Sequence, residues 1–140
     1  VQGFRYFNVY GKGEENKGDQ ASPFSKFTKQ ALEKGKIDVF EGSTEYKRDF
    51  VCVEDVCKVH KKMLDIDTSG IYNVGTGKAN SFEDVAQTIA KKYNAKINYI
   101  PIPENIKLQY QKYTCANIDK LNSLIDIDWK DIKDFINDTQ

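Results

Sequence analysis

The stretch of residues 3–19, GFRYFNVYGKGEENKGD, constrains the possible folds of this chain more than any other part of its sequence. Its first half is an aromatic, β-prone run that predicts a strand over residues 3–9. The run then breaks at Gly11 and Gly13 into a charged loop that carries Lys17. We therefore expect a sheet strand whose end delivers polar groups to a ligand crevice. Because the chain opens inside this strand, we also expect it to be the back part of a larger protein.

Predicted strands and helices alternate along the remaining sequence. Further strands are expected over residues 37–40, 48–53, 71–74 and 97–100. Longer helices are expected after the Ser22-Pro23 start signal, around residues 54–64, and after the S-x-x-D capping pattern that begins at Ser81. Short helices over residues 118–124 and 129–135 close the chain. The alternation indicates an α/β architecture.

Length and composition exclude several classes of function. The chain has 140 residues, which fits one domain or a piece of one, and its 21 basic and 21 acidic residues balance. A balanced charge gives no general attraction to nucleic acid or to an anionic membrane, and no apolar run approaches the roughly 20 residues that span a bilayer. The three cysteines form no C-x-x-C pair and only one histidine is present. We therefore expect free thiols in a reducing compartment, the cytoplasm, and no metal site.

Lys17 and Asn8 are candidates for chemistry at the end of the first predicted strand. Ligands of open α/β sheets collect at the carboxyl ends of strands, where a loop lysine can act as an acid/base group. The alternative for Lys17 is an ordinary solvated lysine in a charge run. The amide of Asn8 offers both donors and an acceptor to a sugar hydroxyl or carbonyl, whereas the alternative is an asparagine that forms a turn.

Arg48 is a candidate for binding a phosphate, because a guanidinium can hold two phosphate oxygens at once. The alternative is an ion pair with Glu45 or Asp49. Residues 75–77, Gly-Thr-Gly, look at first like a phosphate cradle but lack both common glycine-rich phosphate motifs, so a tight connection between a strand and a helix is favoured. Tyr110 and Tyr113 could cover a base or ribose, or pack against the final helices.

Four segments resemble one enzyme family in order and spacing. They are GFRYFNVYG, ENKGDQAS, FEGSTEYKRDFVCVEDV, and GIYNVGTGKANSF followed by YIPIPENIKLQYQKYTCANIDKL. Together they resemble the C-terminal half of the ADP-glyceromanno-heptose 6-epimerases, which are extended short-chain dehydrogenase/reductase enzymes. RYFNVYG and KRDFV are shared by many nucleotide-sugar epimerases and dehydratases. The KG pair, the FEGS turn and the YIPxP segment favour the heptose epimerases.

The resemblance implies a fold in two parts and a redox epimerisation. The last strands of a Rossmann-like parallel sheet would be joined to a small C-terminal α/β domain that binds ADP-heptose. An NADP-binding N-terminal region would be absent from residues 1–140. The family inverts C6 of the heptose through a transient ketone and thereby supplies heptose for the lipopolysaccharide inner core. The full-length protein is expected to form a homo-oligomer, and the fragment alone to be inactive.

The resemblance also assigns roles to individual residues. The family uses the tyrosine of a Y-x-x-x-K motif and a loop lysine as acid/base groups, and the loop lysine matches Lys17, which would also adjoin the cofactor. Val9 would contact the cofactor as well. Substrate contacts are implied for Asn8, Asp19, Lys26, Phe40, Glu41, Gly42, Ser43, Arg48 and Tyr110, with Arg48 on the diphosphate.

The chain departs from the family pattern at three positions. The family commonly has serine at the position of Asp19, histidine at Lys26 and proline at Lys12. An aspartate facing a diphosphate sugar would be repulsive unless it is paired, for which Lys26 is the candidate. A related enzyme acting on another nucleotide sugar therefore remains an alternative, as does a non-catalytic module that binds sugar nucleotides.

Overall fold

The structure is a computed structural model and describes residues 1–139. Three pairs of strands are parallel: β1 (Gln2–Tyr6) with β6 (Gly70–Val74), β2 (Asn8–Tyr10) with β5 (Phe50–Cys52), and β3 (Lys36–Phe40) with β8 (Lys96–Ile100). One pair is antiparallel, β4 (Lys47–Arg48) with β7 (Asn80–Ser81). The helices are η1 (Gly18–Gln20), α1 (Pro23–Lys34), α2 (Val53–Met63), α3 (Phe82–Tyr93), α4 (Glu104–Lys107), α5 (Asp119–Asn122) and α6 (Ile132–Asp138). The predicted α/β class is confirmed. Within residues 1–139, no helix has both the length and the apolar character needed to cross a bilayer.

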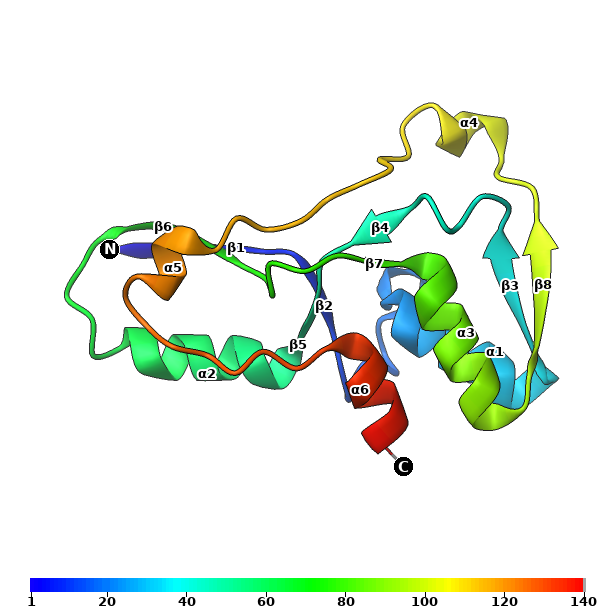
Figure 1. The fold of residues 1–140 in the computed structure, drawn as a ribbon, viewed down its shortest axis with the longest axis horizontal. Coiled ribbons are helices and arrows are strands. Elements are labelled where there is room, and N and C mark those ends of the chain that lie inside the picture. Colours follow the sequence, from blue (N-terminus) through cyan, green and yellow to red (C-terminus); the bar gives the residue numbers. More distant parts are fainter. Residues whose placement is uncertain (140) are drawn as a thin grey trace.

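The chain builds two hydrophobic cores at opposite ends of the molecule (Figure 1). One lies around α1, α3 and α6 beside the β3–β8 pair and is centred on Ile37, Ile89 and Ile132, which are fully buried. The other lies between the β1–β6 pair, α2 and α5, where Val59 and Tyr72 are buried. Between them runs the β4–β7 pair (Figure 1). The β2–β5 pair joins the two cores, since Tyr10 and Phe50 belong to the first and Val51 to the second.

The first predicted strand is divided into two, because the chain changes its pairing partner. The backbone N–H of Phe7 still donates to Val74 of β6 at 3.0 Å, whereas that of Asn8 donates to Asp49, beside β5, at 3.0 Å. The prediction of one strand over residues 3–9 is therefore wrong in detail, and Asn8 begins β2 instead of ending a strand. The strand predicted over residues 48–53 is divided in the same way, since Arg48 belongs to β4 and the segment after Asp49 to β5.

The capping signals of the two long outer helices are confirmed. Ser22 caps α1, its hydroxyl accepting the backbone N–H of Ser25, and α1 ends at Gly35, whose positive φ of 66° favours glycine. The hydroxyl of Ser81 accepts the N–H of Asp84 at the start of α3. The last helix begins three residues later than predicted, at Ile132, because the carboxylate of Asp131 accepts the N–H of Lys133 and caps it there.

Candidate functional site

A cavity of about 360 Å³ lies among α1, β3, the turn after β3 and the start of α3. Aromatic rings form much of its wall: Phe27, Phe40, Tyr46, Phe82 and Tyr110. Its polar lining includes Lys26, Gln30, Asp38 and Ser43. The predicted site residues Lys26, Phe40, Ser43 and Tyr110 are thus brought together, from segments up to 84 positions apart in the sequence. An aromatic cavity with a few polar groups suits a flat, partly polar ligand such as a nucleoside.

Arg48 lies against the aromatic wall of this cavity. Its guanidinium carbon is 5.3 Å from the ring centroid of Phe82 and 5.3 Å from that of Tyr110, which is cation–π geometry. One nitrogen donates to the carbonyl of Lys47 at 2.9 Å. Among residues 1–139 Arg48 has no ion-pair partner within 4.0 Å. The guanidinium is therefore held in place while most of its donors remain free for an anion.

The ion pairs considered for Arg48 are absent, because both carboxylates have other partners. Glu45 lies 3.7 Å from Lys112. Asp49 is completely buried, and its carboxylate accepts the backbone N–H groups of Thr76 at 2.8 Å, Gly77 at 2.9 Å and Ala116 at 3.1 Å. Asp49 thereby ties the segment after Arg48 to two distant loops. Sequence reasoning noticed this residue only as a possible partner of Arg48.

The Gly75–Thr76–Gly77 loop does not fit a dinucleotide phosphate, and it leads from β6 into the short strand β7 instead of directly into a helix as predicted. Its N–H groups point at the buried carboxylate of Asp49, which occupies the position that an anion would take. A Cβ atom at Gly75 would lie 2.7 Å from an oxygen of that carboxylate, so the close approach requires glycine. This loop therefore offers no cradle for a cofactor.

The turn after β3 is fixed to the first turn of α3. The hydroxyl of Ser43, which is buried, donates to the carboxylate of Glu83, which also accepts hydrogen bonds from Tyr99 and Gln87. Burial alone would raise the pKa of Glu83, but the hydrogen bonds from Gln87, Ser43 and Tyr99 lower it overall. The other two predicted residues of this turn, Glu41 and Gly42, are exposed.

The Lys17 loop leaves the far end of β2 and is mostly exposed. The side chain of Lys17 is 48% exposed, and its Nζ atom lies 3.6 Å from Oε1 of Glu14. Lys17 does not line the aromatic cavity. A second cavity, of about 640 Å³, is lined by Gly11, Glu14 and Gly18, and Lys26 lines both cavities. Lys26 is thus the link between the loop and the aromatic site.

The side chains of Asp19 and Lys26 are not paired as expected. Nζ of Lys26 donates to the main-chain carbonyl of Asp19 at 2.6 Å, and both residues are exposed. The Asp19 carboxylate is not within ion-pair distance of Lys26 in residues 1–139. Asn8 and Val9 are half-buried in β2, and Val9 packs against the core beneath α2.

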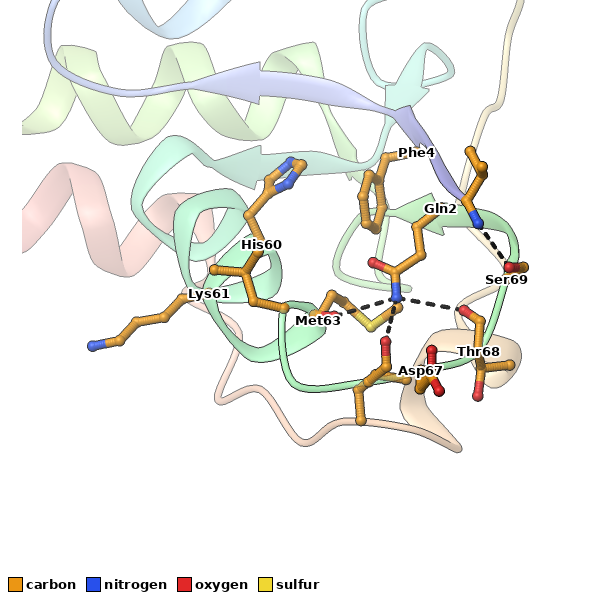
Figure 2. Close-up of a pocket in the computed structure, with 11 residues that line it drawn as sticks. Gln2, Phe4, His60, Lys61, Met63, Asp67, Thr68 and Ser69 are labelled. Atoms are coloured by element: carbon orange, nitrogen blue, oxygen red, sulfur yellow. Dashed lines mark hydrogen bonds between the residues drawn. The ribbon is translucent and has the colours of Figure 1, made fainter.

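A further cavity, of about 710 Å³, lies at the other end of the molecule beside α2 and holds none of the predicted site residues (Figure 2). Figure 2 shows the amide of Gln2 donating to main-chain carbonyls, of which Ile66 lies at 2.8 Å and Met63 at 3.2 Å. Nearby, Nε2 of His60 is 2.6 Å from the hydroxyl of Tyr6. This cavity lies apart from the aromatic cavity and shares no lining residue with it.

Sequence reasoning missed several residues of the site: Glu14, Tyr46, Asp49, Phe82 and Glu83. Phe82 follows the capping residue Ser81, but nothing in a local pattern indicates that its ring would lie against Arg48. Glu14 belongs to a run of charges that looks fully solvated. A buried charge within an exposed run can be recognised only from its contacts.

Comparison with known proteins assigns the class. The sequence profile of the NAD dependent epimerase/dehydratase family matches residues 1–75, and the chain belongs to this family. Within it, the chain is a homologue of ADP-L-glycero-D-manno-heptose-6-epimerase. It is 41% identical over 141 aligned residues to the enzyme of that name from Alkalilimnicola ehrlichii, covering 95% of this chain and 44% of the relative.

Two solved structures have a similar fold, and the more similar one agrees with this assignment. The ADP-L-glycero-D-manno-heptose-6-epimerase of Helicobacter pylori matches 98% of this chain and 42% of its own length, with 30% identity and a TM-score of 0.83. A UDP-N-acetylglucosamine 4-epimerase from Methanobrevibacter ruminantium, solved with UDP-N-acetylmuramic acid, matches 97% of this chain and 42% of its own length at 23% identity and a TM-score of 0.77. The second match supports the fold alone. The chain thus spans less than half the length of these relatives.

Proposed function

We propose that this chain is the substrate-binding portion of an NADP-dependent epimerase that inverts C6 of ADP-D-glycero-D-manno-heptose to the L-glycero form. The observation that carries the proposal is Arg48, a cation held by Phe82 and Tyr110 at the wall of an aromatic cavity. This combination suits a nucleoside joined to a diphosphate. The homologue from Alkalilimnicola ehrlichii supports ADP-heptose as the particular nucleotide sugar.

The residues of this chain take complementary roles in the proposal. Arg48 binds the diphosphate, and Tyr110 together with the turn from Phe40 to Ser43 encloses the nucleoside. The hydroxyl of Tyr110 remains protonated, since burial raises its pKa even though Arg48 opposes this. It can therefore donate a hydrogen bond to the substrate.

The sugar would extend from the diphosphate toward the Lys17 loop. Asn8, Asp19 and Lys26 contact the sugar or its phosphates, and for Lys26 this role is supported by its position in the lining of both neighbouring cavities. Lys17 moves a proton to or from the sugar oxygen at C6. A second acid/base group, a tyrosine, would come from a region outside residues 1–140.

NADP, when bound, would accept a hydride from C6 and return it to the opposite face of the transient ketone. In the proposal the dinucleotide is held mainly by a separate Rossmann region whose parallel sheet continues from the strands of this chain. Val9 and Lys17 adjoin it. The full-length protein is proposed to be a homo-oligomer that supplies heptose for lipopolysaccharide.

The test is an epimerisation assay of the full-length protein. The expected result is NADP-dependent conversion of ADP-D-glycero-D-manno-heptose, with much weaker conversion of UDP-, GDP- or dTDP-sugars. Absence of turnover with intact cofactor would remove the substrate assignment. Binding of ADP-heptose without any turnover would instead favour a non-catalytic module.

A second substrate class within the same chemistry is favoured by one observation. Asp19 and Lys26 stand where the family commonly has serine and histidine, and Lys26 is bound to a main-chain carbonyl instead of to the Asp19 carboxylate. If the enzyme acts on another nucleotide sugar, that sugar should be converted faster than ADP-heptose in the same assay.

A further inference from the structure

Glu14 is a buried carboxylate in the middle of an exposed loop. It is 5% exposed, whereas its neighbours in residues 12–20 are all exposed. Burying a carboxylate is costly unless hydrogen bonds or an opposite charge compensate it. Oε1 of Glu14 accepts the backbone N–H of Ser22 at 2.9 Å, and Oε2 accepts the hydroxyl of Ser22 at 2.7 Å and the N–H of Gly11 at 3.3 Å.

These hydrogen bonds fix the carboxylate on both of its oxygens. Gly11 is the first residue of the loop, and Ser22 is the N-cap of α1, so Glu14 is anchored to both ends of the segment that carries Lys17. At Gly11 φ is +151° and a Cβ atom would lie 2.6 Å from Val53, so the chain enters the loop along a path that requires glycine. The position of Glu14 is therefore set by the fold and not by the loop alone.

Lys17 is tied to this anchor through both its main chain and its side chain. Its backbone N–H donates to the carbonyl of Glu14 at 3.0 Å, and its Nζ lies 3.6 Å from Oε1. Within residues 1–139, Glu14 provides the one carboxylate at ion-pair distance from Lys17. A lysine on a flexible four-carbon stem loses much rotamer freedom when it is held in one place, so an anchored opposite charge matters for its orientation.

We propose that Glu14 is a positioning residue that holds the ammonium group of Lys17 for proton transfer. The proposal rests on the acid/base role of Lys17 in the proposed function. Glu14 does not contact the sugar and does not exchange a proton in the reaction. Removing its charge leaves Lys17 in the protein but frees Nζ to sample other directions, and misplacement of a catalytic group lowers the rate of the chemical step more than it lowers binding.

The experiment is a double-mutant cycle on kcat in the full-length protein. Glu14→Gln is expected to lower kcat by about tenfold with little change in KM. Its matched control is Glu15→Gln, which removes the adjacent exposed carboxylate and should leave kcat unchanged. In a Lys17→Ala background, Glu14→Gln should cause no further loss, because the group that it positions is gone. Equal losses in both backgrounds would overturn the proposal.

A further variant, Ser22→Ala, distinguishes a loss of loop anchoring from a loss of the charge beside Lys17. It removes one hydrogen bond to Glu14 and the cap of α1 but leaves the Glu14 carboxylate in place. A loss of kcat as large as that of Glu14→Gln at equal thermal stability would reduce Glu14 to a structural anchor. If Lys17→Ala leaves kcat unchanged, the acid/base assignment fails and the positioning role fails with it. If Lys17→Ala lowers kcat but the cycle shows no coupling, only the positioning role fails.

A spectroscopic measurement tests the contact without turnover. After reductive ¹³C-methylation, the NMR signal of Lys17 is assigned by its loss in Lys17→Ala. Glu14→Gln should shift this signal and Glu15→Gln should not. An unchanged signal in Glu14→Gln would contradict the contact even if that variant were too unstable for kinetics.

Discussion

Arg48 and Lys17 are the two cations on which the proposed site depends, and the structure holds them in different ways. Arg48 is half-buried against the rings of Phe82 and Tyr110, which come from positions 34 and 62 residues further along the chain. Lys17 is 48% exposed and is held by Glu14, three residues before it. In the proposal, binding of the diphosphate by Arg48 therefore depends on the packing of distant segments, whereas the acid/base role of Lys17 depends on contacts within residues 11–22. The two should respond differently to substitution.

The largest expected effect is on turnover when the loop lysine is removed. Lys17→Ala in the full-length protein should lower kcat by about 10²- to 10⁴-fold, the usual contribution of a general acid/base group. Affinity for ADP-heptose should change little, because Arg48 and the aromatic cavity remain. Steady-state kinetics and calorimetric binding together measure the two effects.

Lys12→Ala is the matched control for this substitution, since it removes an exposed lysine from the same loop. It should change neither kcat nor KM appreciably. Equal losses from both variants would mean that loop charge, and not a particular ammonium group, is what matters.

The next effect is on the stability of the region around Arg48. Asp49→Asn replaces one of the two carboxylate oxygens by an NH₂ group. If Oδ1 is replaced, the NH₂ group faces the N–H donor of Thr76; if Oδ2 is replaced, it faces those of Gly77 and Ala116. Because buried donors are then left without acceptors, the free energy of unfolding should fall by about 2–4 kcal/mol. Urea denaturation measures the change.

Asp65→Asn, at an exposed carboxylate, is the control and should lie within about 0.5 kcal/mol of the original protein. A small decrease in the free energy of unfolding of Asp49→Asn would show that the region around Arg48 does not depend on the hydrogen bonds of the buried Asp49 carboxylate. In that case the contrast between a packed region and a local loop would be weaker than the structure indicates.

A smaller effect is expected when the guanidinium itself is replaced. Arg48→Lys keeps the charge but loses the planar fork and its stacking on Phe82 and Tyr110. Affinity for ADP should fall by about tenfold, or roughly 1.4 kcal/mol. Isothermal titration measures it, with Arg5→Lys on the exposed side of β1 as the control. Unchanged affinity for ADP would place the diphosphate elsewhere.

The sequence predicted local features better than contacts between distant segments. The caps of α1 and α3 follow from Ser22-Pro23, Gly35 and Ser81, because capping depends on residues within one turn. The division of the strand between Phe7 and Asn8 could not be predicted, since it arises when the chain changes its partner from β6 to β5.

The candidate site shows the same contrast between local and long-range features. Phe40 and Ser43 line the aromatic cavity and Arg48 lies against its aromatic wall, whereas the substrate contacts that the family resemblance implied for them stay predictions. The stacking of Phe82 and the buried state of Glu14 depend on packing against residues of other segments, which charge and hydropathy patterns do not report. The family resemblance identified the candidate positions themselves, whereas the residues that hold them in place were found only from the contacts in the structure.

The smallest expected effect concerns pH at Glu83, whose carboxylate joins Ser43 on the cavity wall to Tyr99 and Gln87. Because its pKa is lowered on folding, the stabilisation is fully present above the ordinary carboxyl pKa of 4.5 and is lost as the pH falls through the lowered value. Because Glu83 is partly exposed, its charge contributes only about 1 kcal/mol to the free energy of unfolding. Glu83→Gln should therefore be slightly less stable than the original protein at pH 7, and the difference should shrink at pH values below the ordinary carboxyl range.

Thermal unfolding of both proteins across this pH range measures the difference, with Glu33→Gln on the exposed face of α1 as control. A difference that stays constant with pH would mean that the charge of Glu83 is not what holds the turn. A difference that shrinks, with ADP affinity falling over the same range, would tie the turn after β3 to the packed region of the site. Lys17 would stand apart, since its anchor Glu14 belongs to a different loop.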